Sequence, residues 1–449
     1  MAEFIITTKS TSGAPAIRLR YDTSVSSLVN ADTGEPVAPR IETVKKPSAF
    51  QVSVNQPATK TSPKVLKISL GLSCNYECEY CSQRFVPRAA ETNPGEVKSF
   101  VSELDAWVTS EPNRIEFWGG EPLVYIKTMR PLAEALRVKY PNAMFSIITN
   151  GSLLTLELNE WLDTMGFSVG LSHDGPGQSV RGPDPLDSPE TKAAILDLWK
   201  RLGPQRRMSF NAMLNRNNPS RAAIQQFFAD LVQDPNVPIG EGAFVDAYDE
   251  GGAANSLKPE EFAAFRNLSF AEIRTGQAAN FHAVRDRVTS FVNSIRVGRK
   301  SDSLSQKCGM DLPENIAVDL RGNVMTCQNV SAASVAPNGQ SHNIGHVSDL
   351  ANVKLNTATH WAKRSECPNC PMLHICKGSC MFLEGDLWET SCDNAFSDAV
   401  PIFAAAIEFM TGLVPMRIDG PQREDRKDLW TQQVAPARPR VIPIVAHKA

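Results

Sequence analysis

Short apolar runs and amphipathic stretches alternate from Val65 to about Tyr248, and this alternation constrains the fold more than any other feature. Helical spacings of three, four and seven residues fill the intervals, most clearly from Ile224 to Leu231. Strand–helix units in series predict a parallel sheet with right-handed crossovers, whose functional residues gather at the carboxyl ends of the strands. The expected strands are Val65–Leu70, Arg114–Trp118, Ala143–Ile148, Phe167–Leu171, Arg207–Leu214 and Glu241–Ala247.

The segments around this region predict a chain of five parts. Alternating residues near the N-terminus, at Glu3–Thr8 and Ala16–Tyr21, indicate an extended β-arm packed on the main body, with a substrate-docking arm as the alternative. Two helical stretches, Pro259–Arg274 and Asn280–Arg296, follow the alternating region. The parts are an N-terminal arm (1–64), the alternating region (65–250), a helical connector (251–300), a cysteine-rich part (301–395), and a C-terminal helix with an extended tail (396–449).

Composition argues against two classes of partner. The net charge is −3, with 42% apolar and 21% charged residues, which is unlike a strongly electrostatic binder of nucleic acid. The apolar stretch Ala399–Val414 is too short to cross a membrane and carries Glu408, so it predicts a buried helix. The first residues lack the sections of a signal peptide, which favours the cytoplasm.

The ten cysteines fall in two groups, and such clustering in a reducing compartment indicates metal binding rather than disulfides. Cys74, Cys78 and Cys81 directly follow the first expected strand. Their spacing lets one loop wrap three corners of a cubane cluster and leaves the fourth iron open, which is a catalytic arrangement. A zinc loop that lacks a ligand and three unrelated thiols are the alternatives.

The pattern CxxxCxΦC, with Tyr80 in the aromatic position, resembles the signature of the radical S-adenosylmethionine (SAM) superfamily. At the end of the second expected strand, the run of Gly119, Gly120, Glu121 and Pro122 resembles its GGEP motif. The resemblance implies that the backbone and glutamate of this motif hold the methionine amino group of SAM. It also implies a partial (β/α)6 TIM-like barrel in which a [4Fe–4S] cluster helps to cleave SAM to a 5′-deoxyadenosyl radical.

Other strand ends carry residues that resemble the same family. Asn150 follows the third strand, and Ser172 ends the fourth within a Ser-His-Asp-Gly-Pro run that precedes Arg181. In the family the serine contacts ribose, the arginine can pair with the SAM carboxylate, and positions such as Met213 lie near ribose and adenine. Each motif alone is a common turn sequence, so the resemblance rests on their order at successive strand ends.

The seven later cysteines resemble those of the SPASM domain, which houses two auxiliary [4Fe–4S] clusters in enzymes that modify peptides and proteins. Half a zinc ribbon is the alternative, although seven cysteines do not divide into four-cysteine zinc sites. The resemblance implies one auxiliary cluster on Cys308, Cys327 and Cys380, and another on Cys367, Cys370, Cys376 and Cys392.

The first auxiliary set is one ligand short, because no cysteine lies between Tyr248 and Cys308, where some relatives have an extra one. We therefore expect an open iron or a ligand other than cysteine. The run from Asp319 to Gly322 is expected to be a hairpin turn rather than a source of that ligand.

The resemblance implies a maturase that abstracts hydrogen from a residue of a ribosomally made peptide and forms a crosslink or a similar modification. Anaerobic sulfatase-maturing enzymes share this architecture, but the position of their catalytic aspartate is Gln328 here, and an amide cannot accept a proton at useful pH. Oxidation of a protein Cys or Ser, or of a small alcohol or sugar, is the alternative reaction. A non-catalytic iron–sulfur or zinc protein is the alternative of another class.

The expected partners are a peptide or protein substrate and a flavodoxin- or ferredoxin-type electron donor, with no nucleic acid and no membrane. Residues 1–64 are too short and strand-like for the winged-helix-like recognition module of some relatives, so the peptide would dock on the arm or be presented by another protein. No catalytic acid or base can be named from the sequence, and Tyr80 and Trp118 are expected to be packing residues.

Overall fold

The computed structural model describes residues 2–10, 15–41, 58–89, 92–240, 243–355 and 359–430. Its main body is an eight-stranded sheet in the order β11-β10-β9-β4-β5-β6-β7-β8. The strands are β4 (Val65–Ser69), β5 (Arg114–Trp118), β6 (Met144–Thr149), β7 (Phe167–Ser172), β8 (Met208–Asn211), β9 (Asn315–Asp319), β10 (Asn323–Met325) and β11 (Asn343–His346). Strands β4 to β8 are parallel, and β9 joins them parallel to β4.

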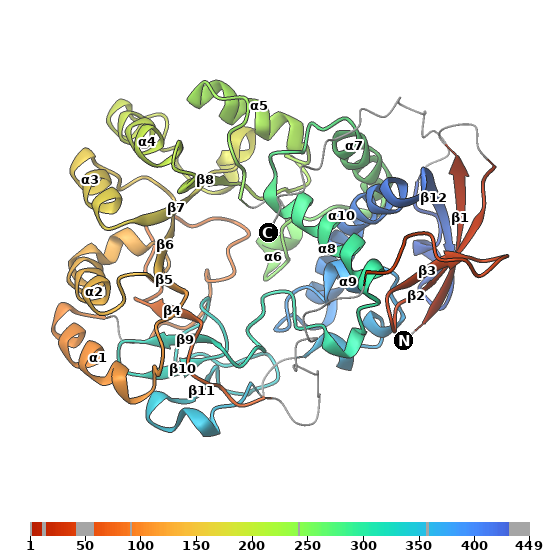
Figure 1. The fold of residues 1–449 in the computed structure, drawn as a ribbon. Coiled ribbons are helices and arrows are strands. Elements are labelled where there is room, and N and C mark those ends of the chain that lie inside the picture. The colour runs from red at the N-terminus through yellow and green to blue at the C-terminus, as the bar shows by residue number, and fades with distance from the viewer. Residues whose placement is uncertain are drawn as a thin grey trace.

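Five helices cover the outer side of the parallel strands (Figure 1). They are α1 (Val97–Glu103), α2 (Ile126–Lys139), α3 (Leu156–Thr164), α4 (Pro189–Leu202) and α5 (Arg221–Val232). Residues alternate along each strand, so Phe117, Phe145 and Phe167 form one buried aromatic cluster, with ring centroids 5.4 to 5.5 Å apart. The first five expected strands and the parallel sheet are thus confirmed, while closure into a barrel stays a prediction.

The sixth expected strand, Glu241–Ala247, is wrong for the part that the structure describes. Phe244 makes only an isolated bridge to Leu214, and residues 241 and 242 lie outside the described residues. The chain here pairs with the backbone at and after β8 only through single parallel bridges, Phe210 with Ile239 and Leu214 with Phe244. Between these bridges Gly240 lies against Asn211, whose Oδ1 atom would be 2.3 Å from a Cβ atom at that position. Pairing is therefore interrupted, and the described residues form no continuous strand here.

The remaining elements form the other half of the molecule, to the right of the sheet in Figure 1. They are α6 (Glu250–Ala254), α7 (Phe262–Arg274), α8 (His282–Val297), α9 (Leu373–Cys376), α10 (Gly385–Thr411), β1 (Glu3–Ser10), β2 (Arg18–Asp22), β3 (Ser27–Asn30) and β12 (Leu413–Asp419). The expected apolar helix is the second half of α10. No helix of the described residues is long and apolar enough to span a bilayer.

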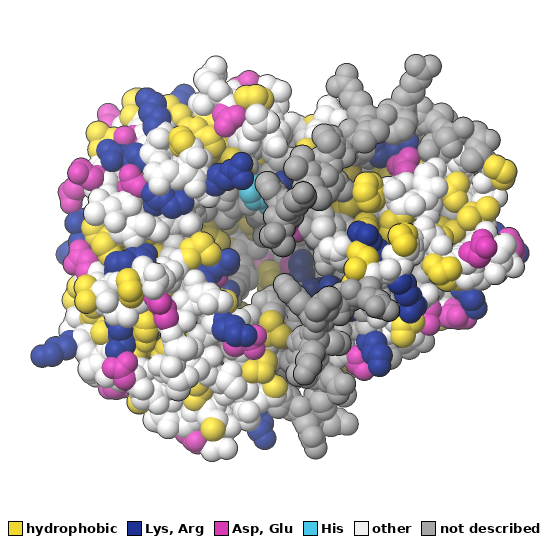
Figure 2. All heavy atoms as spheres, in the orientation of Figure 1, with side chains coloured by type: hydrophobic (Ala, Val, Ile, Leu, Met, Phe, Trp, Pro, Cys, Tyr) yellow, Lys and Arg dark blue, Asp and Glu magenta, His cyan; other side chains and the backbone are white. Residues whose placement is uncertain are grey.

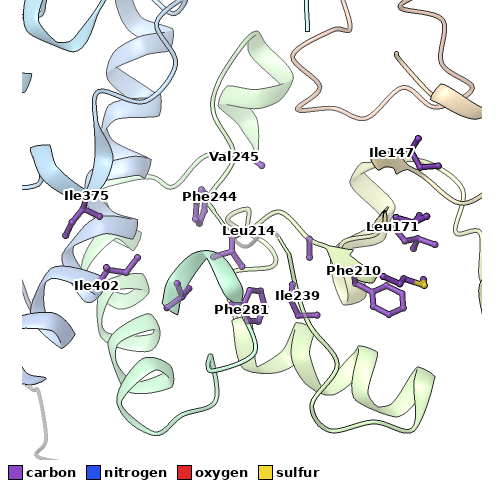
Figure 3. Packing of buried hydrophobic residues seen from close by; sticks show 14 of the residues in the cluster. Ile147, Leu171, Phe210, Leu214, Ile239, Phe244, Val245, Phe281, Ile375 and Ile402 are labelled. Atoms are coloured by element: carbon purple, nitrogen blue, oxygen red, sulfur yellow. The ribbon is translucent and has the colours of Figure 1, made fainter. Parts of the chain in front are cut away.

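The two ends of the chain share a second sheet, in the order β12-β1-β2-β3. The expected β-arm is therefore paired with a strand from the expected extended tail, whose residues 431–449 lie outside the description. Buried apolar residues run from the large sheet across to α9 and α10 (Figure 3). Ile147 and Leu171 lie at one end of that core and Ile375 and Ile402 at the other. The packing makes the two halves one continuous core.

Candidate functional site

Cys74, Cys78 and Cys81 lie in the loop that follows β4. Burial raises the pKa of Cys78 to about 11, the nearby Arg181 lowers it, and Cys81 and Cys74 raise it further. The charges of all three thiols thus act on one another, as expected of cysteines in one loop. Within the described residues no three His, Cys, Asp or Glu side chains surround a single ion. In a four-iron cluster each thiol binds a different iron, and three thiols in one short loop suit that arrangement.

The loop that carries these cysteines pairs with the Gly-Gly-Glu run after β5. The Gly120 amide donates to the Gly71 carbonyl at 3.0 Å, and the Glu121 amide donates to the Ser73 carbonyl at 3.0 Å. A Cβ atom on Gly120 would lie 2.5 Å from the Ser73 oxygen and 2.6 Å from the Leu72 oxygen. Only glycine permits this approach, so Gly120 sets the position of the cysteine loop.

Glu121 is 1% exposed and joins the ends of β5 and β6. Its carboxylate accepts hydrogen bonds from the Leu123 amide (3.0 Å), the Thr149 hydroxyl (2.7 Å) and the Asn150 amide (2.7 Å). A carboxylate offers about four acceptor positions. Three protein donors therefore leave the carboxylate little capacity to bind a ligand. Its main role is to link the ends of β5 and β6.

Asn150 contacts the cysteine loop directly. Its Nδ2 donates to the Asn75 Oδ1 at 2.9 Å, and the Asn75 Nδ2 donates to the Ser152 Oγ at 2.8 Å. Ser152 in turn donates from its hydroxyl to the Asn150 Oδ1 at 2.6 Å. This closed set of hydrogen bonds holds the segment between the first two cysteines against the end of β6.

Tyr80, Asp174 and Arg181 form a buried set beside the cysteine loop. The Tyr80 hydroxyl donates to the Asp174 Oδ2 at 2.5 Å and accepts from Arg181 at 2.9 Å. The Met213 amide donates to the Asp174 Oδ1 at 3.0 Å. Burial and then the neighbouring Asp174 raise the pKa of Tyr80 well above its usual value. The phenol therefore stays protonated and can donate to the carboxylate.

Arg181 has spare donor capacity. Among the described residues its Nε is buried without a hydrogen-bond partner, and its charge acts on Cys74 and Cys78. An unpaired guanidinium donor beside the thiols fits a carboxylate ligand such as that of SAM. Ser172 lies at the end of β7, opposite Asn211 of β8. The structure thus places all the expected SAM-contact positions around one strand-end region, and their ligand roles stay predictions.

Four of the later cysteines surround one small cavity, as the SPASM resemblance implies: Cys367, Cys370, Cys376 and Cys392. Trp388, Phe396 and Arg426 also line this cavity. Burial raises the pKa of Cys370 to about 12, with Arg426 opposing the rise. Arg426 also donates to the Cys392 sulfur at 3.3 Å. A buried four-thiol cavity with one guanidinium fits a closed cluster, whose negative charge the arginine would offset.

The remaining cysteines, Cys308, Cys327 and Cys380, also come together. Burial raises the pKa of Cys327 to about 12, and the charges of Cys308 and Cys380 contribute to that rise. Sequence reasoning missed two residues here, Asp246 and Tyr248, both of which act on the pKa of Cys380 after burial. Asp246 lies where the sixth strand was expected and Tyr248 directly follows it, and the acidic residue in that run was the only signal in the sequence.

A cavity of about 860 Å³ lies on the inner face of the large sheet. Figure 2 shows the molecule hollowed between its two halves, with Lys and Arg side chains at the hollow. Small residues on β6, β7 and β8 leave the space open, namely Ser146, Ser168, Gly170 and Ser209. Cys308 and Gln328 belong to its wall. The volume lies within the range of small-molecule and side-chain binding sites.

Sequence reasoning also missed a charged pair in this cavity, Lys67 and Glu116. They are register partners on β4 and β5, and the Lys67 Nζ lies 3.0 Å from the Glu116 Oε2. Trp118 donates from its Nε1 to the same oxygen at 2.8 Å, so this expected packing residue also has a polar role. The signal in the sequence was a charged residue at the centre of each of two largely apolar strands.

Residues 68–220 match the family model described as the Radical SAM superfamily. Together with the strand-end geometry, this match defines residues 68–220 as a radical SAM domain. A domain of this superfamily implies a [4Fe–4S] cluster and SAM as cofactors. The four-thiol cavity of the C-terminal half agrees with the SPASM resemblance.

The chain is similar to several known members of this class. Radical SAM cyclopropyl synthase TigE from Paramaledivibacter caminithermalis is 25% identical over 36% of this chain and 38% of its own length, so the alignment spans well under half of TigE. The cysteine-type anaerobic sulfatase-maturating enzyme of Clostridium perfringens strain 13 is 24% identical over 68% of this chain and 85% of that enzyme. Native anSMEcpe with bound AdoMet and Cp18Cys peptide has the same fold, with a TM-score of 0.53 at 20% identity over 77% of this chain and 99% of that one.

Proposed function

We propose that this enzyme is a peptide maturase that abstracts hydrogen from a residue of a ribosomally synthesised peptide and installs a crosslink or similar modification. The observation that carries the proposal is the 860 Å³ cavity, which has a wall containing Cys308 and shares β4 and β5 with the cysteine loop. A peptide side chain bound in this cavity would lie between the SAM site at the strand ends and an auxiliary cluster at the wall that contains Cys308.

Residues of this chain would hold three [4Fe–4S] clusters. Cys74, Cys78 and Cys81 would leave one iron open for SAM, which supplies the 5′-deoxyadenosyl radical on one-electron reduction. Arg181 would pair with the SAM carboxylate, the Gly119–Glu121 backbone would receive its amino group, and Ser172, Asn150 and Met213 would line its ribose and adenine. A bound peptide would cover the cavity and so exclude water from the substrate radical.

The partners follow from this chemistry. The peptide or protein substrate would enter the cavity, and a flavodoxin- or ferredoxin-type protein would supply the electron for SAM cleavage. We place the reaction in the cytoplasm, where thiols remain reduced for cluster binding. Two auxiliary clusters, one on four thiols and one on three, would receive the surplus electron.

The second candidate reaction is oxidation of a protein Cys or Ser, which the 85% coverage of the Clostridium perfringens maturase favours. Gln328 counts against it, because the amide in the cavity wall cannot serve as a base. Oxidation of a small alcohol or sugar is the remaining alternative, and it would need no peptide.

Co-expression with a short peptide encoded beside this gene tests the proposal. Mass spectrometry should find the peptide short of two hydrogen atoms, and fragmentation should locate a new bond. The matched control is the triple variant C74A/C78A/C81A, which should leave the peptide unmodified. Conversion of one Ser or Cys residue to an aldehyde, with no crosslink, would favour the second candidate instead.

A further inference from the structure

The charged pair in the cavity has a geometry that suits proton transfer. Glu116 is 8% exposed and belongs to the wall of the cavity. Its Oε2 contacts both the Lys67 Nζ at 3.0 Å and the Trp118 Nε1 at 2.8 Å. Its Oε1 has, among the described residues, only a 3.4 Å contact with Arg114. One carboxylate oxygen is therefore fixed by the protein, and the other retains acceptor capacity.

The surroundings keep this carboxylate ionised. Burial alone would raise the pKa of Glu116, but Lys67, the Trp118 hydrogen bond and Arg114 together hold that pKa below its usual value. Its neighbour on β6 is Ser146, which does not titrate. Lys67 also acts on the pKa values of Cys308 and Cys327, so the pair lies near the three-thiol set.

The cavity wall contains other polar groups, but none lies as close to the centre of the sheet. His282, whose pKa is lowered by burial, begins α8 and bonds through its amide to Ile239, which lies beyond the edge strand β8. Gln328 is an amide and cannot serve as a base. Asp234, the other carboxylate of the cavity wall, accepts a hydrogen bond from the Asn236 amide at 2.8 Å and lies in the loop after α5 rather than on a strand. Glu116 is thus the buried carboxylate of this wall that lies at the centre of the sheet.

We propose that Glu116 is the catalytic base of this enzyme and that Lys67 is the positioning residue that orients and ionises it. The proposal rests on the proposed function and deepens it. The substrate class is a peptide in which the heteroatom–hydrogen bond of one side chain can reach the carbon of another residue that loses its hydrogen atom.

The proposed step forms the new bond by removing a hydrogen atom, a proton and an electron from the substrate. The 5′-deoxyadenosyl radical would first take a hydrogen atom from a substrate C–H bond, which leaves a carbon radical and 5′-deoxyadenosine. The heteroatom–hydrogen bond of the second side chain would then break, its proton would move to the Glu116 carboxylate, and its electron pair would form the new bond between the heteroatom and the carbon. The odd electron leaves to a one-electron acceptor of the iron–sulfur class, which is reduced. The substrate loses two hydrogen atoms in total, and the enzyme gains one proton and one electron.

Glu116→Gln tests the base while it preserves the shape of the side chain. With clusters loaded, the variant should still form 5′-deoxyadenosine within about threefold of wild type. Product should fall about 100-fold or more, because a positioned base contributes that much. With a substrate deuterated at the reacting carbon, deuterium should return to SAM in the variant, since its radical cannot go forward. Glu157→Gln is the matched control, at an exposed ion pair with Arg130, and should leave both products unchanged.

Lys67→Met tests whether Lys67 positions the base, because loss of a purely structural ion pair would not change the pH dependence of product formation. Removing the cation raises the pKa of Glu116, so the acid limb of the pH–product profile should shift upward by about 1 pH unit or more. Product formation by Glu116→Gln within threefold of wild type would overturn the inference. Loss of 5′-deoxyadenosine along with product would also overturn it, because Glu116 would then serve the SAM site. If the wild type itself makes no two-hydrogen product, the proposed function fails instead.

Discussion

Gly120, Glu121 and Asn150 show how residues expected to contact SAM also shape the place where it would bind. Glu121 and Asn150 use most of their hydrogen-bonding capacity on neighbouring strand ends and on the cysteine loop. Sequence patterns locate such residues correctly at strand ends, but they do not reveal which lone pairs are already used. That information depends on how separate loops meet.

Gly120→Ala should damage the cysteine loop. The added Cβ would lie 2.5 Å from a backbone oxygen, which cannot move aside as a flexible side chain would. We expect a loss of stability of about 1–3 kcal/mol and reduced iron at the first cluster. Thermal unfolding and iron analysis check this, and a variant with wild-type iron content and melting temperature would contradict the described approach.

At the scale of elements, local sequence patterns predict most of the parallel strands but not the strands that extend the sheet beyond them. Strands β4 to β7 follow from apolar runs between helical stretches, and the turn at Gly322 follows from the Asp–Gly spacing and has a φ of 82°. The placement of β9 beside β4 joins residues far apart in the chain, and no local pattern signals it. The sixth expected strand was wrong for a similar reason, because the later chain pairs with the backbone at and after β8 only through single bridges, and apolar spacing does not reveal that interruption.

One buried ion-pair set joins α5, α8 and α10. The Asp398 carboxylate contacts Arg221 at 2.5 Å and Arg287 at 2.6 Å. Although burial opposes ionisation, the two arginines lower the pKa of Asp398 to about 2. Asp398→Asn leaves buried cations without their counter-charge, so the free energy of unfolding should fall by about 3–5 kcal/mol at neutral pH.

The pH dependence of that loss has a definite sign. The folded pKa lies below the unfolded value, so the charge of Asp398 stabilises the protein fully above the unfolded pKa. The contribution then disappears as pH falls toward 2. Urea unfolding of both proteins at several pH values should show the largest difference at neutral pH and a shrinking one in acid. A difference independent of pH would contradict this assignment.

At the scale of the whole molecule, β1 and β12, from distant parts of the chain, pair in the small sheet, while the large sheet contains the candidate active site. The sequence predicts strands at the N-terminus and a buried helix near the C-terminus, but their pairing through β1 and β12 is a long-range contact that spacing cannot reveal. The Lys67–Glu116 pair is similar, because each charge is visible in the sequence while their shared register is not.

Ile6→Ala tests whether the N-terminal sheet is part of the main core. Ile6 is fully buried on β1, whereas the neighbouring Ile5 lies on the other face and is only half-buried. Truncation of Ile6 should cost about 2–5 kcal/mol in unfolding free energy, and Ile5→Ala should cost clearly less. Chemical denaturation checks both, and equal small losses would indicate that the sheet is dispensable.

The claim that Cys74, Cys78 and Cys81 hold a SAM-cleaving cluster is tested most directly by measuring 5′-deoxyadenosine from the anaerobically reconstituted protein with SAM and dithionite. We expect the wild type to form it and C74A/C78A/C81A, with its auxiliary clusters still loaded, not to form it. Absence of 5′-deoxyadenosine from a wild-type protein with all clusters loaded would contradict this claim.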